Sequence, residues 1–179
     1  MLELIGQIFQ LFTDLIPRPI KIGPTERGVR VRHWGDAEVE VIEPGLHIYL
    51  PIMTGIEIYP VNSQLIETAI LVAESHDGVN YQTRIAVEYE IDDPEAYFFQ
   101  SHDSQLHLEM VAGATLISVV NDYDSSDFRE MGSRAVCRKV RDRIRERLRS
   151  RGVRILAVRP VMFSTCIPVF TSEAERLAD

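Results

Sequence analysis

The sequence predicts an α+β fold: a mainly antiparallel, meandering sheet with about three helices packed on it, preceded by a short amphipathic helix. Two changes of hydrophobic periodicity carry this prediction. Apolar and polar side chains alternate in successive runs between Arg27 and Ile91, apolar ones recur at helical spacing from Asp92 to Arg151, and alternation returns after Gly152. Strands first, helices second and one returning strand are typical of α+β domains.

The first sixteen residues have the spacing of an amphipathic helix, with apolar side chains on one side and polar ones mostly on the other. Pro17 and Pro19 end this helix because proline lacks the backbone donor, and an extended connector follows. We therefore expect three parts. They are the helix and connector over 1–23, a single domain over 24–168, and a short tail over 169–179.

The alternating runs predict strands that each bury one face. These strands cover residues 29–31, 39–41, 46–50, 65–73 and 79–91. In the third of them, Leu46 and Ile48 are on the apolar side, and His47 and Tyr49 are on the polar side. Turn sequences separate the strands, namely Gly35-Asp36, Glu43-Pro44-Gly45 and Asp77-Gly78.

Three helices are predicted after the strands. The first covers 95–100 and begins after the Asp93-Pro94 start signal, and the second covers 104–120 with a broad apolar face. The third begins near Ser126 and ends at Gly152, a residue suited to a left-handed cap. A last strand follows over 153–163.

Composition excludes several classes of protein. At 179 residues, with 45% hydrophobic and 26% charged residues, the chain is suited to one compact domain, and its net charge of −8 disfavours general nucleic-acid binding. Cys137 and Cys166 are expected to be reduced thiols. The apolar stretch ending at Ile16 would be about 23 Å long as a helix, too short to span a bilayer alone. No Lys or Arg precedes Arg18, so no secretory signal is recognised, and we expect the cytoplasmic side.

Two polar clusters resemble metal sites only in part. Asp122, Asp124 and Ser126 have the spacing of calcium ligands, but the required glycine and the final glutamate are absent, which favours a helix-capping loop. His102 and His107 are five residues apart, about 140° around a helix, which is unsuited to a shared metal. Nucleophile and phosphate-loop motifs are also absent, so we expect no catalytic residue, metal or cofactor, and no enzyme.

The third helix is strongly basic. Residues 129–154 contain eleven basic and three acidic residues, a local charge of +8, which leaves −16 elsewhere. Such segregation favours association of identical subunits, the basic helix of one facing an acidic surface of the next. A solvated basic face and binding of an anionic lipid or nucleic acid are the alternatives. The predicted interface residues are Arg138, Arg141, Arg145 and Arg149.

The apolar side of the N-terminal helix is a candidate docking surface. Its residues are Leu4, Ile5, Ile8, Phe9, Phe12, Leu15 and Ile16. Interfacial helices usually carry Lys or Arg on the polar face, whereas this one carries Glu3 and Asp14. A membrane surface, a protein partner and packing on the chain's own domain therefore all stay open.

Short motifs occur in a defined order along the chain, namely Pro24–Val29 with Glu43–Pro51, Asp77–Val79, Val87–Ala96 and Arg151–Val158. Their order resembles that in the SPFH, or band 7, domain of stomatins, prohibitins and flotillins. Each motif alone is weak, but their order and spacing over about 24–168 are specific. The resemblance implies a non-enzymatic scaffold that forms homo-oligomers, often rings or cages, and commonly sits on a membrane.

The chain departs from the family pattern at both ends. Only 172–179 is available where family members continue into a long coiled coil, so we expect no coiled-coil wall, and an acidic amphipathic helix replaces the usual membrane segment. The helix before the last strand is rich in arginine instead of glutamate. Two functions follow. One is a scaffold that assembles side by side and docks to a membrane or to other structural proteins. The alternative is a structural subunit of a viral or phage particle, with the N-terminal helix as an inter-subunit arm.

Overall fold

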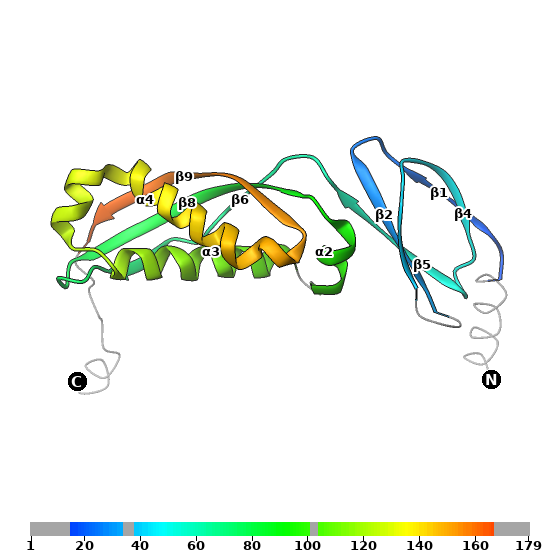
Figure 1. The fold of residues 1–179 in the computed structure, drawn as a ribbon, viewed down its shortest axis with the longest axis horizontal. Coiled ribbons are helices and arrows are strands. Elements are labelled where there is room, and N and C mark those ends of the chain that lie inside the picture. The colour runs from blue at the N-terminus through cyan, green and yellow to red at the C-terminus, as the bar shows by residue number, and fades with distance from the viewer. Residues whose placement is uncertain (1–14, 34–37, 101–103, 167–179) are drawn as a thin grey trace, which may run out of the picture. The chain divides into compact units, whose positions relative to one another are not determined.

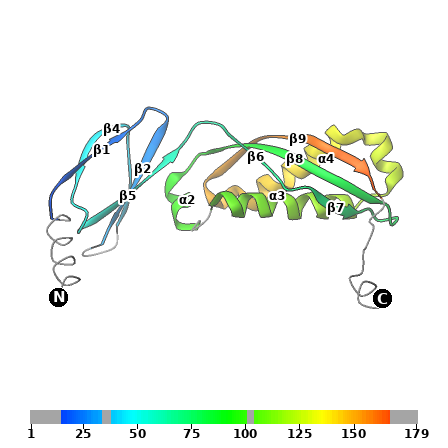
Figure 2. The same ribbon diagram turned by 180° about the vertical axis from the view of Figure 1, so that it is seen from behind.

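A computed structural model describes residues 15–33, 38–100 and 104–166 (Figures 1 and 2). These residues form two compact units. Unit 1 contains the described residues up to 64 together with those in 88–104 and 145–156, and unit 2 contains those in 65–87, in 105–144 and from 157 onward. Within the described ranges the chain forms antiparallel sheets and three α-helices, which confirms the predicted α+β class.

The strands of unit 1 form two small sheets. They are β1 (Arg18–Ile22), β2 (Glu26–Arg32), β3 (Val39–Ile42), β4 (Gly45–Tyr49) and β5 (Thr54–Pro60). One sheet pairs β1 with β4, and the other has the order β3-β2-β5. The prediction was therefore wrong in two respects: residues 18–22 form a strand instead of a connector, and β4 pairs with β1 instead of continuing a meander from β3. Sequence reasoning also missed β5.

The β4 strand has its predicted alternation, but the exposed face is the reverse of the expected one. Leu46 is 73% exposed and Ile48 is 69% exposed, whereas His47 and Tyr49 are half-buried. Pairing with β1 explains this reversal. His47 is opposite Ile20, on the face that includes the buried Ile22, so the other face of β4 is turned to water.

A small core lies where the sheets of unit 1 approach one another. Ile22 of β1, Val29 of β2 and Ile42 of β3 are all buried. Gly28 permits the approach, since a Cβ there would lie 2.6 Å from both Ile22 Cδ1 and Ile42 Cγ1. Any larger residue at this position would push the two isoleucines apart.

The remaining strands form a third sheet around one long strand. These strands are β6 (Gln64–Glu67), β7 (Leu71–Glu74), β8 (Asn80–Ile91) and β9 (Val153–Thr165). Each of the other three pairs with β8. The predicted strand over 65–73 is interrupted at 68–70 and becomes β6 and β7. Asp77-Gly78 makes the predicted turn, with a φ of 82° at Gly78.

The helices lie close to their predicted positions. They are α2 (Pro94–Gln100), α3 (Ser104–Asn121) and α4 (Ser125–Leu148), followed by a 3-10 turn, η1 (Arg149–Arg151). Gly152 has a φ of 68°, so it is the left-handed cap that the sequence predicted. Gly132 interrupts α4 with a φ of 71° and a ψ of 160°, a kink that was not predicted.

In unit 2 the helices and strands share an apolar core, and α3 runs along the strands of the sheet in both views (Figures 1 and 2). Leu116 of α3 and Val140 of α4 are fully buried. At one end of this core Phe128 of α4 packs edge-on against Tyr81 of β8 and Phe163 of β9, with ring centroids 5.2 and 5.4 Å apart. These contacts hold the first turn of α4 against the sheet.

Candidate interaction surfaces

The predicted docking residues lie mostly outside the part of the chain that the structure describes. This applies to Leu4, Ile5, Ile8, Phe9 and Phe12. Leu15 and Ile16 are described, and their exposed fractions are 57% and 59%. None of the helices in the described ranges is long and apolar enough to cross a membrane.

A second exposed apolar surface is formed by β4 and its partner β1, and β1 begins two residues after Ile16. Leu46 is opposite Lys21 of β1, and Ile48 is opposite Pro19. We call these four residues the β4 face. Side chains on opposite positions of paired strands share a face, so two large apolar groups, a proline and one lysine are presented together. The alternation in the sequence groups Leu46 with Ile48, but it gives no sign that water lies on their side.

The four arginines of the predicted interface are divided between the two units. Arg138 and Arg141 belong to unit 2, and Arg145 and Arg149 belong to unit 1. Arg141 binds the neighbouring Asp142 at 2.9 Å, and Arg145 Nε donates to the carbonyl oxygen of Ile155 at 2.9 Å. Arg138 and Arg149 are exposed, and neither forms an ion pair with another described residue.

Arg145 and Arg149 line a hollow of about 480 Å³, which we call the unit 1 hollow. Its lining is Asp92, Arg145, Glu146, Arg149, Val153, Arg154 and Ile155. Arg154 forms ion pairs with Glu90 and, at 3.5 Å, with Asp92. Carboxylates thus offset much of the positive charge of this hollow.

Arg138 lines a different hollow of about 630 Å³, which we call the unit 2 hollow. Its lining is Arg134, Arg138, Val158, Arg159 and Pro160. Three guanidinium groups gather here, and no carboxylate from the described part of the chain lines the hollow. Arg134, like Arg138, is exposed and makes no ion pair with a described residue.

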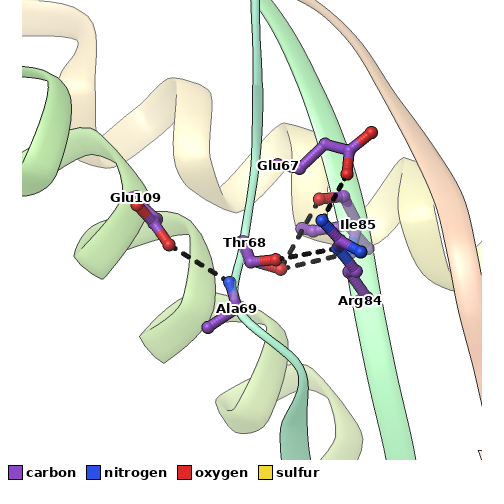
Figure 3. Close-up of polar contacts among 6 residues, drawn as sticks. All are labelled: Glu67, Thr68, Ala69, Arg84, Ile85 and Glu109. Atoms are coloured by element: carbon purple, nitrogen blue, oxygen red, sulfur yellow. Dashed lines mark hydrogen bonds and ion pairs between the residues drawn. The ribbon is translucent and has the colours of Figure 1, made fainter.

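An apolar groove of about 300 Å³ borders the interrupted strand of unit 2. Ala69 and Leu71 form one side, and Leu106, Met110 and Ile117 of α3 form the other. Leu106 and Met110 are both more than half exposed. The polar residues at this position are shown in Figure 3.

Hydrogen bonds from side chains replace the strand pairing that is lost between β6 and β7 (Figure 3). The backbone N–H of Ala69 donates to Glu109 Oε1 at 3.1 Å, and the N–H of Ile85 donates to Thr68 Oγ1 at 3.2 Å. Arg84 donates to the carbonyl oxygen of Thr68. The backbone groups at the interruption are therefore hydrogen-bonded, and Glu109 is one of the acceptors.

The loop before α4 caps that helix. Asp127 Oδ2 accepts from the N–H of Asp124 at 3.2 Å, and Asp122 forms an ion pair with Arg143 at 2.6 Å. Asp77 accepts from the backbone N–H and the hydroxyl of Ser125. The hydrogen bonds from Ser125, together with one from Ser75, lower the pKa of Asp77 to about 2. These contacts favour the capping interpretation of the loop.

The remaining candidates for chemistry are metal ligands and cysteine thiols. Among the described residues, no three His, Cys, Asp or Glu side chains are grouped as metal ligands, and His102 and Asp103 lie outside those residues. Cys137 is buried and Cys166 is partly buried, and both are free thiols. Burial raises the pKa of Cys137 to about 11, which keeps it protonated at neutral pH.

Comparison with known protein families gives a match. The model of the SPFH domain / Band 7 family matches residues 20–164, most of the chain. This range includes both arginine-lined hollows and, apart from Pro19, the β4 face. A search among curated proteins finds no match.

Proposed function

The chain belongs to the SPFH domain / Band 7 family, and from this premise we propose that it is a non-enzymatic scaffold of the stomatin/prohibitin type that assembles side by side with copies of itself. We further propose that it docks to a membrane surface through its N-terminal segment and the β4 face. The observation that carries the proposal is the distribution of unpaired charge and exposed apolar groups on otherwise well-packed strands and helices.

Charge supports the self-association. Arg138 and Arg149 are exposed without a described ion-pair partner, and so are the carboxylates Glu74, Glu95 and Glu130. Opposite charges left unpaired on one chain can pair between copies, and a heterologous contact of this kind repeats from subunit to subunit. The strength of such contacts falls with added salt.

The β4 face supports the docking. Leu46 and Ile48 are as exposed as Leu15 and Ile16, and β1, which pairs with β4, begins two residues after Ile16. Lys21 adds a cation beside these apolar groups. Large apolar side chains with a flanking lysine are suited to the boundary between lipid headgroups and acyl chains.

Light scattering at about 0.1 M and then 0.5 M salt tests the assembly. We expect a defined oligomer whose mass falls toward the 20.4 kDa of one chain at the higher salt. The double variant R138E/R149E should dissociate at lower salt than the parent. R30E/R32E is the matched control, because it changes the net charge equally in residues that pair with Glu40 and Glu38. A monomer at both salts would overturn side-by-side assembly.

Flotation with phosphatidylcholine vesicles, with and without phosphatidylserine, tests the docking. We expect L46S/I48S to bind several-fold less than the parent, since each substitution removes apolar area from the membrane interface. L65S/V72S is the control because both residues are about as exposed but belong to unit 2. Equal flotation of parent and L46S/I48S would exclude the β4 face. Loss of the oligomer on deleting residues 2–16 would make the helix a subunit contact instead.

A further inference from the structure

We propose that the unit 2 hollow is a binding site for a phosphoryl group, the dianionic terminal phosphate of a small ligand or of a lipid headgroup. The site consists of Arg134 and Arg138 on α4 and Arg159 on β9, with Val158 and Pro160 as its apolar part. Arg138 is shared with the proposed self-association, so the tests below use Arg134 and Arg159, which are not among the proposed contact residues.

The arrangement of the arginines is unfavourable without an anion. Arg134 and Arg138 are four residues apart in the regular part of α4 beyond Gly132, so their side chains are neighbours on the helix surface. Like charges at this spacing destabilise a helix by a few tenths of a kcal/mol. Arg159 lines the same hollow. A bound dianion would convert the repulsion between Arg134 and Arg138 into attraction.

The chemistry of the lining selects a phosphoryl group. Guanidinium groups bind phosphate oxygens through paired, parallel hydrogen bonds, and three of them can share the oxygens of one tetrahedral anion. Val158 and Pro160 have no side-chain hydrogen-bonding group that could compete for the guanidinium donors. At about 630 Å³ the hollow has room for a phosphate with an attached organic group.

In the unit 1 hollow of the same chain, carboxylates already lie beside the arginines. There Asp92 and Glu146 are part of the lining, and Arg154 is paired with Glu90 and Asp92. An incoming anion would have to compete with these carboxylates. In the unit 2 hollow, Arg134 and Arg138 have no such competitor among the described residues.

Calorimetric titration of the full chain with pyrophosphate tests the site. We expect R134Q/R159Q to weaken binding by about tenfold or more, the loss that corresponds to one or two charged hydrogen bonds. R145Q/R149Q is the matched control, because it removes the same charge from the same region of the chain but from the unit 1 hollow. R134K/R159K keeps the charge and loses the paired hydrogen bonds, so its affinity should be intermediate.

Three results would overturn the proposal. They are the absence of pyrophosphate binding, equal weakening by R134Q/R159Q and by the control, and equally tight binding of the dicarboxylate malonate. Vesicles of phosphatidylcholine with phosphatidic acid identify the source of the ligand. Flotation that is lost in R134Q/R159Q would support a lipid headgroup, and binding of pyrophosphate without such flotation would support a soluble phosphate compound.

The same samples separate this inference from the proposed scaffold function. R145Q/R149Q should lower the mass measured by light scattering and leave pyrophosphate affinity unchanged. R134Q/R159Q should leave the mass unchanged and lower the pyrophosphate affinity. Failure of one expectation with success of the other therefore shows which of the two proposals is wrong.

Discussion

The two arginine-lined hollows of this chain have three guanidinium groups each and differ in what else lines them. In unit 1, Asp92 and Glu146 lie beside the arginines, and Glu90 is the ion-pair partner of Arg154. In unit 2, the other lining residues are Val158 and Pro160. The same helix contributes arginines to both.

This difference shows that the number of arginines on a helix does not define an anion site. The local charge of +8 over residues 129–154 includes arginines of both hollows without distinguishing them. What separates them is Glu146 of α4 together with carboxylates at the end of β8, which is far away in the chain. Net charge is a property of the sequence, whereas the charge that a ligand meets is a property of the fold.

The largest effect on stability should come from substituting Gly152, which lies between Arg149 and Arg154 of the unit 1 hollow. In Gly152→Ala, a Cβ would lie 2.1 Å from the carbonyl oxygen of Asp93 and 2.9 Å from the backbone nitrogen of Tyr97, at a φ of 68°. Backbone cannot move aside as a flexible side chain can, so we expect a loss of about 3–5 kcal/mol in the free energy of unfolding. Urea denaturation measures this loss.

Gly132→Ala is the control for that substitution, because Gly132 precedes the arginines of the unit 2 hollow. Its φ of 71° is similar, but no atom lies within 4 Å of the position that a Cβ would take. Only backbone strain remains, and because its ψ of 160° lies in a region essentially confined to glycine, we expect about 1–3 kcal/mol. Equal losses in the two variants would mean that the contact with α2 does not determine the effect at Gly152.

A carboxylate added to the unit 2 hollow should make it resemble the unit 1 hollow. In Val158→Glu the new side chain would pair with the neighbouring guanidinium groups, and we expect the affinity for pyrophosphate to fall about tenfold, or by about 1.4 kcal/mol. Calorimetric titration measures the change. Val72→Glu, at an exposed position of unit 2, is the control for net charge. An unchanged affinity in Val158→Glu would place the anion elsewhere.

Removing the carboxylates from the unit 1 hollow should allow it to bind anions. We expect D92N/E146Q to gain weak affinity for pyrophosphate, by less than tenfold, since Arg154 keeps its ion pair with Glu90. The gain should disappear when Arg149 is also replaced by Gln. If D92N/E146Q binds pyrophosphate no better than the parent, the carboxylates are not what closes this hollow.

The fold was predictable where local signals decide it. Gly152 ends the last helical segment as expected, and Asp77-Gly78 forms the expected turn. The pairing of β1 with β4 was not predictable from local sequence, because strand partners depend on contacts that are distant in the chain. Exposure of Leu46 and Ile48 follows from this pairing, so an alternation that correctly grouped them assigned them to the wrong side.

The candidate sites were predictable to a smaller degree. The sequence drew attention to the arginines of α4, and two of the four named residues, Arg138 and Arg149, are exposed without a described ion-pair partner. It did not indicate that Arg159 of β9 joins Arg134 and Arg138, since that requires knowing how β9 lies beside the helix. Nor did it indicate that Glu109 of α3 accepts a hydrogen bond from the N–H of Ala69.

The smallest effect should be a pH dependence confined to the unit 2 end of α4. Asp77 accepts hydrogen bonds from Ser125 at the start of that helix, and these bonds lower its pKa from 3.8 to about 2. Because the folded state favours the ionised form, the stabilisation is present above pH 3.8 and is lost as the pH falls from 3.8 toward 2. The Gly152 end has a backbone cap that involves no titrating group, so it should not respond.

Hydrogen-exchange protection of the first turn of α4, normalised for the intrinsic exchange rate, should therefore fall over this range while protection around Gly152 stays constant. In Asp77→Asn the first turn should already be less protected at neutral pH and should lose its pH dependence. A parallel loss at both ends would instead indicate general acid unfolding, and the two ends of α4 would then not differ in what holds them.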